Sequence, residues 1–311
     1  MFDHKNLLSI DELSAEDIMT VLTYAKTFEE VNERPIKKVP ALCGKTICNL
    51  FLEPSTRTRG SFELAEKRLS ADSLSMGGST SSVVKGESLA DTIQTISAMN
   101  VDMFVCRAKL AGTPQRITEN TDAVVINAGD GKHQHPTQAM LDLYTIRKNF
   151  GHLDGLKVAI VGDLAHSRVC GSLAPALKTM GAEVTLVGPP TFQVDDPDWF
   201  GCPQTASLDD VIEDMDVVYM LRVQLERMEG AAIPSRREYN RLYGLDMTRV
   251  NRMKPGAIIC HPGPMNRGME INADVADCAR SRILNQVNAG VLTRMAEMYL
   301  LLGGENNGLS A

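Results

Sequence analysis

The sequence has no long uninterrupted apolar run. Nothing in it approaches the roughly 18 consecutive apolar residues of a membrane-spanning helix, and Met1–Lys5 lacks the apolar core that begins a signal peptide. Positive charge is also scarce, because 32 Lys and Arg stand against 39 Asp and Glu, for a net charge of −7. That balance does not give the basic footprint of a nucleic-acid-binding protein. We therefore expect a cytoplasmic protein whose partners include neither membrane nor nucleic acid.

Paired cysteine motifs are missing as well. The seven cysteines are scattered and odd in number, and no Cys-x-x-Cys pair occurs, so the sequence suggests neither a zinc site nor a disulfide framework. Cys48, Cys106 and Cys260 lie within apolar runs, where a buried, reduced thiol is the expected state. Reduced thiols are typical of a cytoplasmic protein.

The common nucleotide-binding fingerprints are absent too. No Gly-x-x-x-x-Gly-Lys-[Ser/Thr] segment occurs, and residues 162–165, Gly-Asp-Leu-Ala, depart from Gly-x-Gly-x-x-Gly after the first glycine. His133 and His135 alternate as metal ligands sometimes do, but a third ligand is not evident and Pro136 follows directly. We expect neither a cofactor nor a metal.

What the sequence does contain is a regular alternation of apolar segments. Its 311 residues suffice for two ordinary domains, and the pattern breaks at Gly151–Gly155 and then restarts. Strand-like runs lie at 46–52, 71–76, 101–107, 123–128, 156–161, 183–187, 217–221 and 257–260. Helical periodicity between these runs predicts two similar α/β domains, each a parallel sheet flanked by helices.

The segment Ser55-Thr56-Arg57-Thr58-Arg59 follows the first strand-like run and precedes a helical pattern from Ser61. The N–H groups of a helix's first turn lack internal partners and carry partial positive charge, so they readily bind phosphate or carboxylate. Hydroxyls add donors, and an arginine fork matches a phosphate. The segment predicts an anion site, with an ordinary hydroxyl-capped helix and solvated arginines as the alternative.

Polar residues, or residues with special backbone properties such as proline and glycine, directly follow other strand-like runs. They are Arg107, His135–Gln138, Arg168, Arg222–Gln224 and Pro262–Pro264. In open parallel sheets ligands bind beyond the carboxyl ends of the strands, so together with the segment 55–59 these residues predict one active site in the cleft between the domains. Arginines concentrated there in an acidic chain favour a strongly anionic ligand, such as a phosphate with one or more carboxylates.

Some of the candidate residues can also be interpreted one at a time, without a shared site. Arg107 can equally serve as a structural ion-pair partner. Lys85 follows a Gly/Ser loop and can be a solvated side chain, although such loops also close over substrates. His135 precedes a helix and suits a donor to a substrate oxygen.

These motifs resemble those of the carbamoyltransferases that use carbamoyl phosphate. The resemblance begins with Ser55–Arg59 and His135–Gln138 and covers almost the whole chain in order. Val83–Ser88, Arg222–Arg227 and His261–Gly268 resemble the catalytic chains of the aspartate carbamoyltransferase branch. The ornithine branch typically has His-Cys-Leu-Pro in the last of these loops, where this chain has His-Pro-Gly-Pro.

The resemblance implies which domain binds which substrate. Residues 1–134, joined by a carboxy-terminal helix at 288–303, would bind carbamoyl phosphate, residues 135–287 would bind aspartate, and 304–311 would be a flexible tail. The reaction would transfer the carbamoyl group to the amine of L-aspartate, giving N-carbamoyl-L-aspartate and phosphate, an early step of de novo pyrimidine biosynthesis.

The resemblance also implies residue roles. The carbamoyl phosphate ligands would be Ser55, Thr56, Arg57, Thr58, Ser81, Arg107, His135, Gln138, Gly263 and Pro264. The aspartate ligands would be Lys85, Arg168, Arg222 and Gln224. The catalytic residues would be Arg57, Thr58, Lys85, Arg107 and His135. Of these, Thr58, Arg107 and His135 would polarise the carbamoyl carbonyl, while Gln138 and the backbone at 262–264 would hold the carbamoyl amide.

A shared active site is a further implication. In the family a serine and a lysine of one flexible loop enter the neighbouring subunit's site, and Lys85 matches the lysine. Ser81 matches the serine best, with Ser82 as the alternative register. A catalytic homotrimer is therefore expected, and association with a regulatory chain or another enzyme of the pathway stays open.

The proposed chemistry needs no covalent nucleophile, because preorganised donors stabilise the charge that develops on the carbonyl oxygen. The leaving phosphate itself is a candidate acceptor for the amine proton. Three alternatives stay open: a carbamoyltransferase for another amino acid, a catalytically inactive relative with a regulatory or scaffolding role, and a nicotinamide oxidoreductase. The broken glycine fingerprint disfavours the last of these.

Overall fold

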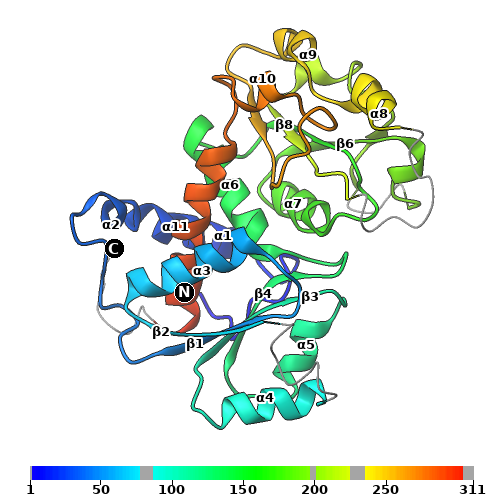
Figure 1. Ribbon diagram of the computed structural model, residues 1–311. Coiled ribbons are helices and arrows are strands. Elements are labelled where there is room, and N and C mark those ends of the chain that lie inside the picture. The colour runs from blue at the N-terminus through cyan, green and yellow to red at the C-terminus, as the bar shows by residue number, and fades with distance from the viewer. Residues whose placement is uncertain (1, 78–86, 197–200, 225–234, 304–311) are drawn as a thin grey trace. The chain divides into compact units, whose positions relative to one another are not determined.

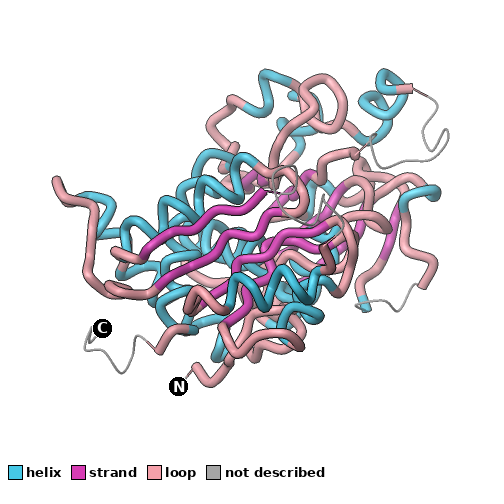
Figure 2. The backbone as a smooth tube through the Cα atoms, turned by 60° about the horizontal axis from the view of Figure 1, so that its bottom comes forward, coloured by secondary structure: helices cyan, strands magenta, loops and turns pink. Residues whose placement is uncertain are grey.

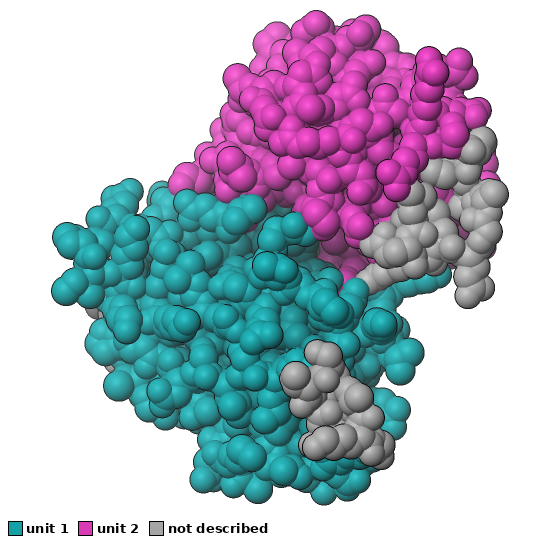
Figure 3. All heavy atoms as spheres, in the orientation of Figure 1, with its two compact units in different colours: residues 1–144, 287–311 teal, residues 145–286 magenta. Residues whose placement is uncertain are grey.

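The computed structural model describes residues 2–77, 87–196, 201–224 and 235–303 (Figure 1). The chain divides into two compact units (Figure 3): unit 1 comprises residues 1–144 and 287–311, and unit 2 comprises residues 145–286. The chain passes from one unit to the other within α6 (Pro136–Phe150) and returns within α11 (Ile283–Leu301).

Within the described residues, unit 1 has a sheet of four parallel strands in the order β2-β1-β3-β4. The strands are β1 (Thr46–Phe51), β2 (Asp72–Gly77), β3 (Met103–Ala108) and β4 (Val124–Asp130). Besides parts of α6 and α11, the helices are α1 (Ala15–Thr27), α2 (Glu29–Glu33), α3 (Thr56–Leu69), α4 (Leu89–Ser97) and α5 (Thr113–Thr118). The predicted parallel βαβ pattern is confirmed in this unit.

Both faces of this sheet are covered, which explains why its two central strands, β1 and β3, are mostly apolar. On one face Leu50 and Phe104 pack in a buried cluster with Ile93 and Ile96 of α4 and Ile117 of α5. Helix α3 lies on the opposite side from α4 and α5 (Figure 1). Helix α3 is therefore fixed against the sheet immediately after β1.

Unit 2 repeats this construction, with a sheet of five parallel strands among its described residues, in the order β7-β6-β5-β8-β9. The strands are β5 (Lys157–Val161), β6 (Glu183–Val187), β7 (Gln204–Thr205), β8 (Val217–Met220) and β9 (Ile258–Cys260). The helices are α7 (Arg168–Thr179), α8 (Arg236–Tyr243), α9 (Met247–Arg252) and α10 (Ala273–Ala276), with 3₁₀ turns at Pro190–Phe192 and Ile212–Asp214. Helices pack along the strands of both sheets (Figure 2).

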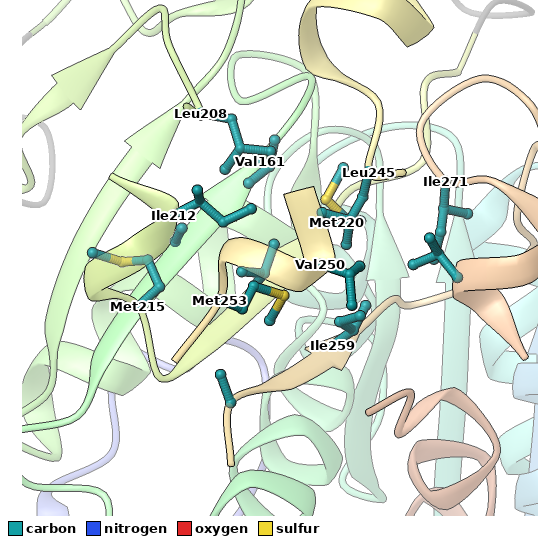
Figure 4. Packing of buried hydrophobic residues seen from close by; sticks show 14 of the residues in the cluster. Val161, Leu208, Ile212, Met215, Met220, Leu245, Val250, Met253, Ile259 and Ile271 are labelled. Carbon is teal, nitrogen blue, oxygen red and sulfur yellow. The ribbon is translucent and has the colours of Figure 1, made fainter. Parts of the chain in front are cut away.

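The core of unit 2 follows from strand alternation. Val161 of β5, Met220 of β8 and Ile259 of β9 point to one face, where they pack with Val250 of α9 and Ile271 (Figure 4). Each of these side chains is at most 3% exposed. This core holds β5, β8 and β9 side by side, so the loops that follow these three strands start from a rigid base.

Because all strands within a sheet are parallel, their carboxyl ends lie along one edge. In unit 1 this edge carries the segment 55–59 after β1, Arg107 at the end of β3, and the segment 135–138 after β4. In unit 2 it carries Arg168 after β5, the segment 222–224 after β8 and the segment 262–264 after β9. The topology therefore gathers the predicted site residues into two sets, one in each unit.

Several elements differ from the sequence-based expectations. Helix α11 begins at Ile283, five residues before the predicted start at Asn288. Strand β7 and helices α8 to α10 were not predicted, since they are short and mostly half-exposed. In the described part of the chain, no helix combines the length and the apolar character needed to cross a membrane.

Candidate active site

The amino-terminal end of α3 lacks the side-chain cap that begins helices α1, α4, α7, α8 and α9. Ser55 is its N-cap residue, with extended backbone, yet the Ser55 side chain accepts no hydrogen bond from the first turn. By contrast, Ser14, Ser88 and Ser235 cap their helices with side-chain hydrogen bonds. The first turn of α3 also contains no acidic residue. Its N–H groups and partial positive charge are thus available to an anion.

The two arginines of this segment have different surroundings. Arg59 donates from Nε to Glu63 Oε1 at 2.8 Å, one turn further along α3. Burial by itself raises the pKa of Glu63, but hydrogen bonds from Ser75 and Arg59 outweigh it and hold this pKa below its ordinary value. Arg57 is exposed on the first turn. Its guanidinium is therefore accessible to an anion at the helix terminus.

Arg107 contacts the same helix from the end of β3. Its Nη1 atom donates to the Thr58 hydroxyl at 3.4 Å and to the Ala128 carbonyl at 3.3 Å. Its Nε atom lies 3.7 Å from a carboxylate oxygen of Glu53. The predicted ligands Arg107 and Thr58 are thus brought together, and the ion pair considered as the simpler interpretation of Arg107 is also present.

An irregularity in β4 aims the Ala128 carbonyl at Arg107. Cys106 pairs with Asn127 and Ala108 with Asp130, so β4 contains one more residue than β3 between these two pairs, which is a β-bulge. Gly129 takes a φ of +111°, a conformation that favours glycine. Such bulges redirect backbone groups beside functional sites.

His135 and Gln138 lie where β4 leads into α6. Both are buried, at 3% and 8% exposure. The Gln138 amide nitrogen donates to Asp142 Oδ1 at 3.1 Å. Because a carboxylate only accepts, this contact fixes which end of the Gln138 amide is the nitrogen. The Gln138 oxygen is thereby oriented as an acceptor, which suits an N–H donor such as a carbamoyl amide.

In unit 2, Arg168 is the first residue of α7 and is 4% exposed. Arg222 and Gln224 follow β8 and are half-buried. Guanidinium groups at neighbouring strand ends are well suited to carboxylates, which they bind as forks.

The segment after β9 carries the third predicted group of unit 2. Gly263 has a φ of +64°, and the peptide bond between Gly263 and Pro264 is cis. The Gly263 N–H donates to His261 Nδ1 at 2.8 Å. This contact gives the segment a defined backbone, whose peptide groups can meet a small ligand.

Two predicted residues lie outside the described part of the chain, namely Ser81 and Lys85, as does the alternative Ser82. Sequence reasoning missed the residues that hold the site in place, such as Glu53 and Asp142. Asp142 carried a usable signal, since a polar pair four residues apart on a helix lies on one face. In the part of the chain that the structure covers, no cluster of three His, Cys, Asp or Glu side chains forms a metal site.

Comparison with family models matches both halves of the chain. Residues 5–148 match the carbamoyl phosphate-binding domain of aspartate/ornithine carbamoyltransferases, and residues 154–301 match the aspartate/ornithine-binding domain.

Curated relatives are similar over nearly the full length. The aspartate carbamoyltransferase catalytic subunit of Syntrophotalea carbinolica is 51% identical over 98% of this chain and 97% of its own length. That of Thermobifida fusca is 53% identical over 96% of both.

Solved structures have the same fold. Aspartate transcarbamoylase from Trypanosoma cruzi, in complex with carbamoyl aspartate and phosphate, gives a TM-score of 0.87 at 29% identity over 96% of both chains. Ornithine carbamoyltransferase from Pyrococcus furiosus also gives 0.87 at 29% identity, over 96% of this chain and 97% of its own. Fold likeness alone therefore does not separate the two acceptors, but the two family-model matches together span nearly the whole chain, which thus belongs to the aspartate/ornithine carbamoyltransferase family.

Proposed function

We propose that the chain transfers the carbamoyl group of carbamoyl phosphate to the amine of L-aspartate, with the carbamoyl phosphate ligands mainly in unit 1 and the aspartate ligands in unit 2. Relatives that are about half identical over nearly the whole chain are aspartate carbamoyltransferase catalytic subunits. The T. cruzi enzyme of the same fold binds the two products of this reaction. The observation that carries the residue assignment is the contact of Arg107 with Thr58 at the start of α3.

Phosphate binding is assigned to the α3 terminus. Ser55, Thr56 and Thr58 supply hydroxyl donors, Arg57 supplies a guanidinium, and the first-turn N–H groups point in the same direction as the helix dipole. Ser81 is assigned to the same phosphate from a neighbouring subunit.

The carbamoyl carbonyl is polarised by Thr58, Arg107 and His135. When the aspartate amine attacks the carbamoyl carbon, negative charge grows on the carbonyl oxygen and then passes to the departing phosphate. Donors held in place by Glu53, Ala128 and the α3 backbone need little reorganisation as this charge develops.

The carbamoyl amide needs acceptors, since its nitrogen carries two N–H bonds. The Gln138 oxygen has the orientation for one of them, because its amide nitrogen is engaged by Asp142. Backbone carbonyls of the segment 262–264 supply the other. This pairing distinguishes a carbamoyl group from an acetyl group of similar shape.

The aspartate acceptor carries two carboxylates, which are assigned to Arg168, Arg222 and Gln224, with Lys85 from the neighbouring subunit. Holding the amine in line with the carbamoyl carbon supplies much of the acceleration. The departing phosphate takes up the proton that the amine loses, so the protein needs no separate base.

The proposal extends to assembly and place in the cell. Because Ser81 and Lys85 are assigned to a neighbour's site, the chain works as a homotrimer, open to a regulatory chain or another pathway enzyme. We infer a cytoplasmic enzyme of pyrimidine biosynthesis from the scattered cysteines, the acidic composition and the names of the relatives.

The deciding experiment supplies purified protein with carbamoyl phosphate and either L-aspartate or L-ornithine, and measures the carbamoylated product and released phosphate. Turnover with aspartate and little with ornithine is expected. Preferential use of ornithine would overturn the acceptor assignment, and no turnover with either would favour the inactive-relative alternative.

A further inference from the structure

A buried histidine and a buried carboxylate lie beneath the segment after β9. The side chains of His261 and Glu270 are both 0% exposed, and His261 Nε2 lies 3.2 Å from Glu270 Oε1. Neither residue belongs to the proposed set of substrate ligands. A buried charge is costly unless it is paired and hydrogen-bonded, so the arrangement calls for a role.

The hydrogen bonds define the tautomer of His261. The Gly263 N–H can only donate, and its acceptor is His261 Nδ1 at 2.8 Å. Nδ1 therefore carries no proton, and in the neutral ring the proton is on Nε2. Nε2 then donates to Glu270 Oε1. His261 thus connects Glu270 to the backbone of Gly263, one of the residues assigned to the carbamoyl amide.

Glu270 is connected to the second substrate segment through Asn266. The Asn266 backbone N–H donates to Oε1 at 2.5 Å, and its side-chain nitrogen donates to Oε2 at 3.2 Å. The same side-chain nitrogen donates to the Val223 carbonyl at 3.0 Å. Val223 stands between Arg222 and Gln224, the residues assigned to aspartate.

One carboxylate therefore has a hydrogen-bonded branch to each substrate segment. In both branches the first hydrogen bond is donated to a Glu270 oxygen, by His261 in one branch and by Asn266 in the other. Each branch ends on a backbone group, the Gly263 N–H or the Val223 carbonyl, and not on a flexible side chain. Gln286 adds support, since its Oε1 accepts from the His261 N–H at 2.9 Å.

We propose that Glu270 is a positioning residue that sets the carbamoyl segment 262–264 through His261 and the aspartate segment 222–224 through Asn266. The inference rests on the proposed function for its substrate assignments. Its geometric part, the Nε2–H tautomer of His261, does not depend on them.

Two branch-specific variants test the proposal. Asn266→Ala removes the side-chain bond to Val223 but keeps the backbone N–H that Glu270 accepts. It is expected to raise the KM for aspartate about tenfold, with the Kd for carbamoyl phosphate changed by less than about twofold. His261→Gln places a donor near the Nε2 position but offers no acceptor to Gly263, and it is expected to raise the Kd for carbamoyl phosphate by a similar factor.

Matched controls separate positioning from general damage. His261→Asn places an acceptor near the Nδ1 position, so it should bind carbamoyl phosphate more tightly than His261→Gln. Asp277→Asn breaks the exposed pair with Arg267 on the same segment, 2.7 Å apart, and should leave both constants within about twofold. Glu270→Gln cannot accept both Asn266 donors and should impair both substrates.

The outcomes are distinguishable from those for the proposed function. If the parent protein carbamoylates aspartate but Asn266→Ala and His261→Gln impair both substrates equally, the positioning proposal is overturned and the function stands. Nitrogen NMR of the labelled parent protein at neutral pH provides a test that does not need activity or folding of a variant. A proton on Nε2 and none on Nδ1 of His261 is expected, whereas an Nδ1–H tautomer or an imidazolium overturns the proposal.

Discussion

The guanidinium of Arg107 and the hydroxyl of Thr58 lie at hydrogen-bond distance, 3.4 Å between Nη1 and Oγ1. The contact joins the end of β3 to the first turn of α3, two places that are 49 residues apart in the sequence. Glu53 and the Ala128 carbonyl hold the same guanidinium. A cation fixed in this way can meet developing negative charge without first reorganising.

Arg107→Lys should lower kcat by about 10²–10³, because an ammonium keeps the charge but cannot reproduce the fork between Thr58, Ala128 and the substrate. Steady-state kinetics with aspartate measures the effect. Arg59→Lys is the matched control, since Glu63 engages the Arg59 side chain, and it should change kcat by less than about threefold. Near-native turnover in Arg107→Lys would contradict the assignment.

Arg57→Ala should nearly abolish carbamoyl transfer while circular dichroism shows an intact fold. Lys85→Ala should be inactive for a different reason, because it spoils a neighbour's site. Mixing and exchanging the two inactive proteins should restore part of the activity through hybrid trimers. Well-exchanged hybrids that stay inactive would speak against shared sites.

Arg168→Ala and Arg222→Ala should each raise the KM for aspartate by roughly tenfold or more, since each removes a charge-assisted hydrogen bond to a carboxylate. Calorimetric binding of carbamoyl phosphate should change much less. Equal loss for both substrates would count against the proposed division between the units.

Asp142→Asn should loosen the orientation of Gln138, because two side-chain amides can pair either way round whereas a carboxylate only accepts. Carbamoyl phosphate should bind about threefold more weakly. Inorganic phosphate, which has no amide, is the matched control ligand and should bind unchanged. Equal weakening of both ligands would show that Asp142 acts on the phosphate side instead.

A buried carboxyl group in α11 predicts pH-dependent stability. Burial raises the pKa of Glu297 in α11 from its ordinary 4.5 to about 8, although Arg294 acts in the opposite direction. Burial likewise lowers the pKa of Arg294 to about 10, and this side chain stacks on Phe62 and donates to Ser61 of α3.

For Glu297 the folded pKa exceeds the unfolded one, so its contribution to stability is fully present below about pH 4.5 and is lost as pH rises through about 8. The whole change is on the order of a few kcal/mol. Thermal midpoints of the parent protein and Glu297→Gln, compared from pH 5 to pH 8, should diverge in favour of the variant. A constant difference between the two proteins across this range would contradict the prediction.

The sequence predicted the central strands well because β1, β3, β5 and β8 are mostly buried and therefore mostly apolar. Strand β7 was not predicted because its two residues are polar and half-buried, and so give no apolar run in the sequence. The start of α11 was placed too late, since Ile283 follows a polar stretch and precedes an exposed leucine, Leu284.

For the candidate site, sequence order was sufficient to place side chains at strand ends but not to say what holds them. The pairing of Arg107 with Glu53 depends on which strands are neighbours, and the direction of the Ala128 carbonyl depends on a local bulge in β4. The connections of Glu270 to His261 and Asn266 are local in sequence, yet their link to Val223 spans 43 residues. Such contacts follow from the folded backbone, not from spacing.

The N-terminus of α3 has a thermodynamic consequence for the enzyme without substrate. A helix that begins without a side-chain cap loses about 0.5–2 kcal/mol relative to a capped one, and Ser55 makes no such bond. A bound phosphate would supply acceptors to those N–H groups and so act as the missing cap, which couples ligand binding to the order of the helix that binds it. Amide hydrogen exchange in the first turn of α3 should therefore slow, and the thermal midpoint should rise, as inorganic phosphate is added.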